Sequence, residues 1–539
     1  MTYPGSSEKR KFFARLTTGA NSAPIQGGGQ FVRRFGTDGR RVDRLTRGYV
    51  PKSRNIDEIQ KEDDLAKELY SMVFETDENI LVTGAGNKIA VIDSWNQIGL
   101  DSNIMQNINR SGYVHPRKIQ AYAIPLIIDG YDLKAQAETG SGKSAAFLIP
   151  LINKIIGDKK RNPISGGKNK PFAIIMEPTR ELALQLYDQA RKIAFNTGVR
   201  VVKAYGQYDV ADNKKEIMGG SDIVIGTPGR LSQFIGYGTI DVAMLKYLVL
   251  DEADRLISDF NFLGIIQKIR GLSTYPKEEN VQNLLFSATF PEKVEILAND
   301  LLKSKRAFVH NELTIAVNSK ITQEFIACPQ HEKKIKVLEF LKSDLKQAQA
   351  INANAKQPRT LIFVRKRSDA DLVCLFLCDS GIRATTINGD RPQKERELAL
   401  EYFRSNETPV LVATDVCARG LDIKDLDWVI NMDLPDTVET YVHRIGRTGR
   451  LKAGRALSFF DRSTDHSLAS SLVKLLEESN SPNIPAFLRD PKSSQAPANG
   501  FGSQQQSGGS SGFGAQQKSG SFGTKTSGFG NWSSFGSAR

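Results

Sequence analysis

The chain has 539 residues, of which 40% are hydrophobic and 25% charged, and its formal net charge is +13. This length leaves room for two or three domains, each with a substantial core. No stretch approaches the ~18 to 20 apolar residues of a membrane span, and the N-terminus lacks the apolar core of a signal peptide, so we expect neither membrane insertion nor secretion.

The two ends of the chain carry its excess positive charge. Residues 1–54 have a net charge of +9 and residues 491–539 one of +4, which leaves residues 55–490 formally neutral. The C-terminal end consists mainly of Gly, Ser and Gln with five Phe-Gly steps. Neither end can bury enough apolar surface to offset chain entropy, so we predict that both are disordered. They should attract nucleic acid in a diffuse, salt-sensitive way. Because the core is formally neutral, a specific polyanion site there must come from the spatial arrangement of its charged residues rather than from net charge.

Two blocks of alternating strand-like and helical patterns lie between the ends, after a flanking segment at residues 55–94. The first block, residues 95–310, has strand-like runs at 173–176, 222–225, 247–250 and 283–286, and the second, residues 321–490, has them at 360–364, 384–387, 410–413 and 428–431. Such alternation predicts two α/β domains with parallel sheets. Residues 311–320 are the predicted hinge, and residues 346–358, rich in Ala, Gln and Asn, are a predicted surface loop.

A glycine-rich loop in the first block predicts a nucleotide site. It consists of Ala137, Glu138, Thr139, Gly140, Ser141, Gly142, Lys143 and Ser144. Its glycines let backbone N–H groups approach phosphates, Lys143 offers a charge to the β and γ oxygens, and the Ser144 hydroxyl can join a Mg²⁺ shell. A glycine-rich stretch can also be only a turn. We interpret residues 84–88 in this way, as a turn between strands at 80–82 and 90–92.

An acidic run directly follows the apolar run at 247–250. Because a short apolar run that ends in acids suits a buried parallel strand, Asp251 and Glu252 should reach the carboxyl edge of the sheet. Asp251 would then hold Mg²⁺ through water, and Glu252 would position or deprotonate the attacking water. An acidic strand end alone is often only solvated. Together with the glycine-rich loop, in this order, it predicts ATP hydrolysis.

Further motifs make the chain resemble a DEAD-box ATP-dependent RNA helicase of superfamily 2 over roughly residues 95–488. These motifs are Pro178–Ala183 (PTRELA), Thr227–Arg230 (TPGR), Asp251–Asp254 (DEAD), Ser287–Thr289 (SAT), Ala413–Asp415 (ATD), Ala418–Asp422 (ARGLD) and His443–Arg450 (HRIGRTGR). The resemblance implies two RecA-like domains that hold ATP and RNA across the cleft between them. A looser resemblance to the Vasa-related branch comes from residues 80–95, residues 483–488 and the Phe-Gly tail.

The resemblance also assigns residues to nucleotide recognition. Tyr113, Gln120 and Trp95 would recognise adenine, since an amide suits its N6 and N7 edge and an aromatic ring can stack on it. Arg447 and Arg450 resemble arginine fingers, although a basic run is also often a solvated or polyanion-binding face.

Five other residues have roles implied by the family. Asp422, with Gly420, resembles the ribose contact, and His443 would link the acidic motif to the cleft rather than act as an acid or base. Ser287 and Thr289 resemble the motif that couples hydrolysis to strand separation, or they only cap a strand end. The chain departs from the family's Pro-Thr-Pro by reading Pro116-Arg117-Lys118, which removes a hydroxyl.

RNA contacts are implied by the same resemblance. They are Thr179, Arg180, Gly206, Thr227, Gly229 and Arg230 in the first domain, and Arg365, Gly389, Thr414 and Arg419 in the second. Small residues, hydroxyls and helix N-termini let backbone amides bind phosphates. Such contacts recognise the RNA backbone rather than the bases, so we expect little sequence specificity. Where the family has paired glycines, the chain has Gly206-Gln207.

The sequence thus predicts an RNA-dependent ATPase that uses ATP and Mg²⁺, binds single-stranded or short-duplex RNA, and unwinds duplexes or remodels ribonucleoproteins. Two alternatives stay open: an RNA clamp or granule scaffold in which turnover only releases RNA, and a DNA helicase, which the motif set disfavours. We expect a monomeric core and a cytoplasmic location, with perinuclear or germ granules and the nucleus as further sites. The tails would contact granule proteins in mRNA regulation.

Overall fold

The computed structural model describes residues 48–64, 80–86, 90–137, 140–161, 168–258, 262–311, 320–415, 426–449, 453–479, 481 and 484–490. The predicted disordered C-terminal end lies outside these residues, as do residues 1–47 and most of the predicted hinge.

The first sheet has eight strands in the order β1-β8-β2-β7-β6-β3-β5-β4. The strands are β1 Ile80–Thr83, β2 Asp132–Gln136, β3 Ala173–Met176, β4 Val201–Ala204, β5 Ile223–Gly226, β6 Tyr247–Leu250, β7 Gln282–Ser287 and β8 Arg306–Asn311. All neighbouring pairs are parallel except β1 and β8. The central strands β3 and β6 are buried throughout, as expected of parallel strands that helices cover on both faces.

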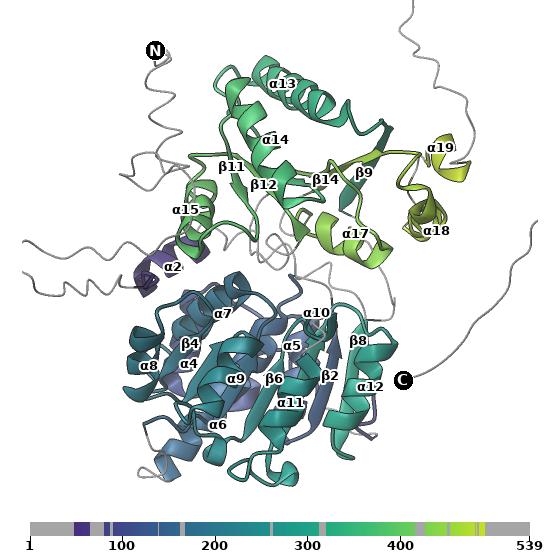
Figure 1. Cartoon of the computed structure of the whole chain (residues 1–539). Coiled ribbons are helices and arrows are strands. Elements are labelled where there is room, and N and C mark those ends of the chain that lie inside the picture. Colours follow the sequence, from purple (N-terminus) through teal and green to yellow (C-terminus); the bar gives the residue numbers. More distant parts are fainter. Residues whose placement is uncertain are drawn as a thin grey trace, which may run out of the picture. The chain divides into compact units, whose positions relative to one another are not determined.

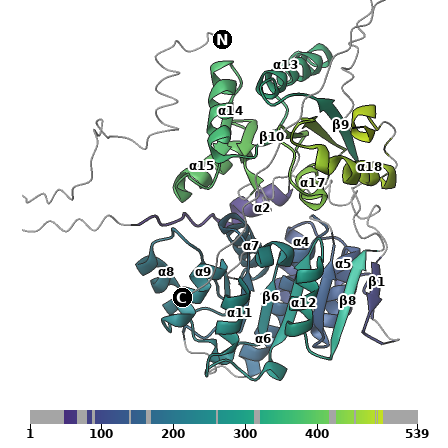
Figure 2. The same ribbon diagram turned by 45° about the vertical axis from the view of Figure 1, so that its right-hand side comes forward.

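Helices cover both faces of this sheet (Figures 1 and 2). They are α4 Ser102–Arg110, α5 Lys118–Ile128, α6 Lys143–Arg161, α7 Arg180–Ile193, α8 Val210–Met218, α9 Pro228–Gly236, α10 Ala253–Ser258, α11 Phe262–Arg270 and α12 Glu292–Leu301. Val249 of β6 packs in the core that α4 to α7 share, whereas Leu248 and Leu250 pack in the core of α9 to α12. The alternation follows from the two-residue period of a strand.

The second sheet has six parallel strands in the order β11-β12-β10-β13-β14-β9. The strands are β9 Ile321–Ala327, β10 Thr360–Phe363, β11 Ala384–Ile387, β12 Val410–Ala413, β13 Trp428–Asn431 and β14 Gly454–Phe460, and the helices are α13 Lys333–Ile351, α14 Arg367–Asp379, α15 Gln393–Arg404, α17 Val438–Ile445, α18 Ala469–Glu478 and α19 Ala486–Arg489. Apolar residues of α13 and α14 share one core with the sheet, and those of α15 share another.

The two sheets confirm the predicted fold class of two RecA-like α/β domains. All eight predicted strand runs are strands, with ends shifted by one residue at most, as for β5. The predicted loop at 346–358 is wrong in its first part, because α13 continues to Ile351 through Lys, Gln and Ala, which are good helix formers. Residues 90–92 form no strand, so only β1 of the two predicted flanking strands exists.

The predicted disorder of residues 1–54 is wrong for residues 48–54, which polar contacts hold in place. Arg54 lies 3.6 Å from Asp188 of α7, and the Asp209 N–H donates to the Tyr49 carbonyl at 2.8 Å. The Tyr49 hydroxyl donates to Glu397 of α15. These partners are far away in sequence, so composition could not reveal them. Helix α2, Ile56–Asp64, follows directly.

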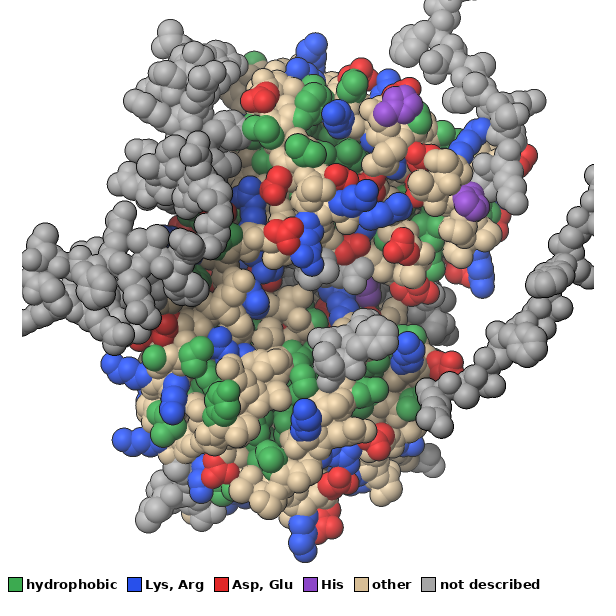
Figure 3. Space-filling view, viewed as in Figure 1, with side chains coloured by type: hydrophobic (Ala, Val, Ile, Leu, Met, Phe, Trp, Pro, Cys, Tyr) green, Lys and Arg blue, Asp and Glu red, His purple; other side chains and the backbone are tan. Residues whose placement is uncertain are grey.

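Charge is dispersed over one face of the folded part. On the face shown in Figure 3, basic and acidic side chains are interspersed over both domains rather than gathered into one patch. No helix in the described ranges is both long and apolar enough to cross a membrane.

Candidate active site

Three predicted motifs meet at one edge of the first sheet because β2, β7 and β6 are neighbours. Gln136 lies opposite Ser287, and Leu250 lies opposite Leu285. The glycine-rich loop, the Ser-Ala-Thr motif and the acidic run therefore start at the carboxyl ends of adjacent parallel strands, where ligands of open α/β sheets bind.

The described part of the loop has a backbone that only glycine adopts easily. Gly140 has φ 93° and Gly142 has φ 94°, and a Cβ on Gly142 would lie 2.5 Å from the Gln120 side-chain nitrogen. That nitrogen donates to the Gly142 carbonyl at 3.1 Å. Arg117 donates to the Gly140 carbonyl, so a guanidinium contacts the loop at the position where the family has a hydroxyl.

Lys143 begins α6 and is buried. Its ammonium donates to the Ala137 carbonyl at 2.6 Å, which holds it beneath the loop. Ser144 follows in the first turn of the helix, whose N–H groups and dipole favour an anion. Glu138 and Thr139 lie outside the described residues.

Three buried carboxylates form what we call the acidic centre: Glu177, Asp251 and Glu252. Glu177 follows β3 and Asp251 follows the adjacent β6, so the two lie side by side, with the Asp251 N–H donating to the Met176 carbonyl at 3.2 Å. The Oε2 atoms of Glu177 and Glu252 are buried and accept no hydrogen bond from any residue that the structure describes, although Glu252 Oε2 lies 3.7 Å from the Arg255 guanidinium. Glu252 has a positive φ of 52°, an uncommon backbone for a residue other than glycine.

The carboxylates shift each other's pKa. Burial, and then the charges of Asp251 and Glu252, raise the pKa of Glu177 well above its usual range. Burial and the Glu252 charge raise the pKa of Asp251 to about 7. Burial alone would also raise the pKa of Glu252, but the charges of Arg255 and Lys143 outweigh it and lower that pKa. The centre therefore favours a ligand that brings positive charge.

The Ser-Ala-Thr motif bonds to the last residue of the acidic run. The Asp254 N–H donates to the Ser287 hydroxyl at 3.3 Å, and the Thr289 hydroxyl donates to the Asp254 carboxylate at 2.7 Å. His443 of the second domain has its Nε2 3.8 Å from the same carboxylate. Burial and the Arg255 charge lower the pKa of His443 well below its usual value, so this imidazole is neutral at pH 7.

The second domain contributes arginines from α17 and the turn that follows. Arg447 is 1% exposed, donates to the His443 carbonyl at 3.1 Å, and lowers the pKa of Glu252 through its charge. Arg444 holds Asp415 with two hydrogen bonds of 2.6 and 2.7 Å. Arg450, Gly420 and Asp422 lie outside the described residues and stay predictions.

Two of the three predicted adenine residues, Trp95 and Tyr113, lie next to each other. Trp95 is 2% exposed, and its indole N–H donates to the Tyr113 carbonyl at 2.9 Å. Tyr113 is half-buried and can offer a ring face to a base. Trp95 thus supports the Tyr113 backbone, a role that the sequence did not indicate.

The predicted RNA residues of the first domain follow β3, β5 and β4, on the other half of the same sheet edge. Thr179 caps α7 by accepting from the Leu182 N–H at 3.3 Å, and a Cβ on Gly229, in the first turn of α9, would meet no atom within 4 Å. Thr227 precedes α9 and forms no side-chain cap. Arg230 is used internally, donating to Asn213 and the Tyr208 carbonyl.

In the second domain, Arg365, Gly389 and Thr414 follow β10, β11 and β12. These three strands are neighbours, so the residues lie along one edge. Thr414 is buried, and its hydroxyl has no hydrogen-bond partner among the residues that the structure describes. Arg419 lies outside the described residues.

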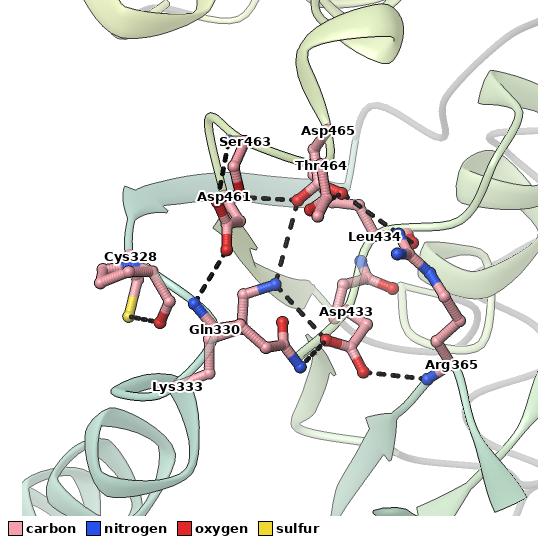
Figure 4. Close-up of polar contacts among 12 residues, drawn as sticks. Cys328, Gln330, Lys333, Arg365, Asp433, Leu434, Asp461, Ser463, Thr464 and Asp465 are labelled. Carbon is pink, nitrogen blue, oxygen red and sulfur yellow. Dashed lines mark hydrogen bonds and ion pairs between the residues drawn. The ribbon is translucent and has the colours of Figure 1, made fainter. Parts of the chain in front are cut away.

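Arg365 lies at the exposed side of a largely buried charged group, shown in Figure 4, that we call the paired cluster. Its members are Lys333, Arg365, Asp433, Asp461 and Asp465. Arg365 donates to Asp465 at 3.2 Å and to the Leu434 carbonyl at 3.1 Å, but its side chain stays 43% exposed. Lys333 is 1% exposed and lies 3.4 Å from Asp433 and 3.9 Å from Asp465.

Sequence reasoning missed several residues of the site. Glu177 directly precedes the PTRELA motif, and its place after a predicted strand was an available signal. Glu181 of that motif forms a buried ion pair of 2.7 Å with Arg396 of α15, and Gln393 donates to Glu181 at 3.1 Å. Nothing in the sequence joins these residues, which are more than two hundred positions apart.

Comparisons with known proteins show the family of the chain. The DEAD/DEAH box helicase family matches residues 117–297, and the helicase conserved C-terminal domain matches residues 340–452. The ATP-dependent RNA helicase glh-1 of Caenorhabditis elegans is 38% identical over 84% of this chain and 60% of its own length. The ATP-dependent RNA helicase DDX4 of Mus musculus is 41% identical over 77% and 58%. The chain thus spans about 60% of the length of these relatives.

Two solved structures share the fold. Dbp5 of Saccharomyces cerevisiae bound to RNA and ADP BeF3 has a TM-score of 0.60 and 26% identity, covering 71% of this chain and 93% of that one. The DEAD-box helicase Mss116 bound to single-stranded RNA and UDP-BeF has a TM-score of 0.62 and 26% identity, covering 74% and 81%.

Proposed function

Because the chain belongs to the DEAD-box helicase family, we propose that it is an RNA-dependent ATPase that binds RNA across both domains, unwinds short duplexes or remodels ribonucleoproteins, and releases RNA after hydrolysis. The observation that carries the proposal is the acidic centre beside the glycine-rich loop. Its buried, mutually repelling carboxylates have free acceptor capacity directly next to a loop shaped for phosphates.

The residues present fit ATP with Mg²⁺. Carboxylate and hydroxyl oxygens are the ligands that Mg²⁺ prefers, and a divalent cation would relieve the repulsion within the acidic centre. Ser144 and, through water, Asp251 would hold the ion, which neutralises phosphate charge when bound. Lys143 and the loop amides bind the phosphates, Glu252 positions the attacking water, and Arg447 and Arg450 stabilise charge on the transferred group.

RNA would lie along the β3-β5-β4 half of the first sheet edge and the β10-β11-β12 edge of the second. Helix N-termini at α7 and α9 offer backbone N–H groups to phosphates, which gives affinity without base readout. The solved relatives that hold RNA and a nucleotide analogue together support this use of both domains.

Glu252→Gln tests the proposal. The amide keeps the size of the side chain but cannot take a proton from water, so the variant should bind ATP and RNA, hydrolyse ATP at least about 100-fold more slowly and hold RNA in a long-lived complex. Asp300→Asn, an exposed change on α12, is the matched control. RNA release from the Glu252→Gln protein as fast as from the parent would refute the assignment.

A second experiment on the parent protein distinguishes a helicase from an RNA clamp. Single-turnover strand separation of a short RNA duplex by the parent supports a helicase, whereas ATP-dependent RNA retention without separation supports a clamp or scaffold. Competition between RNA and DNA strands tests the choice of nucleic acid.

We further propose a Vasa-like role in cytoplasmic or perinuclear germ granules, on the likeness to glh-1 and DDX4 and on the Phe-Gly tail. Tagged full-length and tail-deleted chains, imaged in germ cells with a granule marker, test it. A diffuse full-length protein would refute the granule location.

A further inference from the structure

Gln207, in the turn between β4 and α8, combines two unusual features. Its φ is 65°, in the left-handed region that non-glycine residues rarely adopt. A residue with a Cβ is strained there unless something compensates for the strain. Gln207 is exposed, so burial of its side chain does not provide that compensation.

Its side-chain oxygen bonds to the other domain. The backbone N–H of Gln393, the first residue of α15, donates to the Gln207 Oε1 atom at 2.9 Å. The first N–H groups of a helix have no partner within the helix and are usually capped by the preceding side chain. In α15 that preceding residue is Pro392, which forms no side-chain cap. Gln207 therefore caps a helix of the second domain from the first.

The cap lies within a set of contacts between the same two regions. Arg180 donates to the Gln393 side-chain oxygen at 3.4 Å, and the Gln393 side-chain nitrogen donates to Glu181 at 3.1 Å. Gln393 is 1% exposed, so its polar groups depend on these partners. Arg180 also lies beside Gly206, where a Cβ would approach its guanidinium to 3.1 Å. Gln207 is thus adjacent to predicted RNA contacts and bonded to the opposite domain.

We propose that Gln207 is a positioning residue that strengthens the arrangement in which both domains meet, and thereby couples RNA binding to nucleotide binding. The proposal rests on the proposed function. The cap exists only while α15 lies against the first domain, so its free energy adds to that state alone. When a bound nucleotide populates the same state, the cap therefore adds to RNA affinity, whereas it adds little while that state is rarely populated.

The test measures the coupling factor of the full-length protein, which is the ratio of its affinities for a labelled single-stranded RNA with and without AMP-PNP. Gln207→Gly removes both cap and strain. Gln207→Asn tolerates the left-handed backbone but is one methylene too short to reach Gln393. Both variants should lower the coupling factor about fivefold, as expected for loss of a helix cap. RNA affinity without nucleotide should change less than twofold.

Gln207→Glu is the conservative rescue. It keeps an acceptor oxygen at the same reach, and a carboxylate suits a helix N-terminus, so the coupling factor should stay within about twofold of the parent value. Gly and Asn relieve backbone strain, so these variants should not lose folding, and their melting temperatures check this.

A parent-like coupling factor in Gln207→Gly and Gln207→Asn would overturn the inference and leave Gln207 as a turn residue. Tighter RNA binding by Gln207→Gly without nucleotide would also overturn it, in favour of a closer approach of the RNA backbone. If the parent itself shows no effect of AMP-PNP on RNA affinity, the proposed function fails as well.

Discussion

Each domain buries a group of charged residues, and the two groups differ in how their hydrogen bonds are satisfied. In the acidic centre, Oε2 of Glu177 and of Glu252 accepts no hydrogen bond from the described part of the chain. In the paired cluster, both oxygens of Asp433 and of Asp461 accept, Asp433 from Gln330, Lys333 and the Arg365 N–H, and Asp461 from Gln330 and Ser463.

The difference shows which buried charge belongs to a ligand site. A buried carboxylate oxygen left without a hydrogen bond carries a desolvation cost of about 1 to 3 kcal/mol, so it persists only where something else is gained. The paired cluster satisfies itself and needs no ligand. The acidic centre does not, and its missing partners are what ATP with Mg²⁺ would supply. Burial and charge alone would not have separated the two groups.

The largest effect expected on activity comes from Lys143→Ala. The phosphates lose their principal side-chain charge, so ATP affinity should fall on the order of 10- to 100-fold and RNA-stimulated hydrolysis should disappear. Equilibrium nucleotide binding and a steady-state ATPase assay measure both. Lys160→Ala, at the exposed end of the same helix, is the control. Near-normal turnover of Lys143→Ala would show that the loop is misassigned.

Lys333→Met should lower the stability of the protein and leave its nucleotide affinity unchanged. It removes the cation that two buried carboxylates share, so the domain should lose about 3 to 5 kcal/mol of stability and its melting temperature should fall by roughly 10 °C. Calorimetry of the full chain measures the shift, with Lys342→Met, exposed on the same helix, as the control. AMP-PNP affinity below the melting temperature should not change. If Lys333→Met lost nucleotide affinity but kept its stability, the paired cluster would be part of a ligand site and would not differ from the acidic centre.

Glu177→Gln should stabilise the protein without nucleotide. The raised pKa of Glu177 means that ionisation is harder in the folded state, so stability that is present below the ordinary glutamate pKa is lost as pH rises toward the folded value. The variant avoids that loss, so it should melt at a higher temperature than the parent at pH 8, and the difference should shrink toward pH 5. Melting curves across this range test it against Glu279→Gln, an exposed control. Equal melting curves for parent and variant would mean that ionisation of Glu177 does not destabilise the fold.

Removal of residues 491–539 should have the smallest effect, because their charge of +4 can act only as a screened attraction. Apparent RNA affinity should fall slightly at low salt and the difference should vanish as salt rises. The maximal ATPase rate at saturating RNA should stay unchanged. A lower maximal rate would place the tail among the parts that order the site.

Local patterns predicted much of this molecule, and long-range polar contacts account for the rest. Buried strands such as β6 and β12 are visible in the sequence because they are continuous apolar runs. β2 was missed because its residues, DLKAQ, are largely polar, and Asp132 is buried only because it bonds to Asn283 and to the Lys303 N–H. The site motifs were found by their order along the chain. The pairing of Glu181 with Arg396, and of Arg444 with Asp415, depends on folding and could not be read from local sequence.

Strand β1 shortens the open edge of the first sheet and so reduces the tendency of the chain to self-associate. An open sheet edge offers unpaired backbone groups to another chain, and long edges are the more dangerous ones. Without β1, the six residues of β8 would form such an edge next to the nucleotide-binding strands. The antiparallel pairing covers β8 and leaves an edge of only four residues, Ile80–Thr83. A fragment that begins at Trp95 would keep the catalytic motifs but lose this cover, so aggregation, rather than lost chemistry, is the hazard of cutting the chain there.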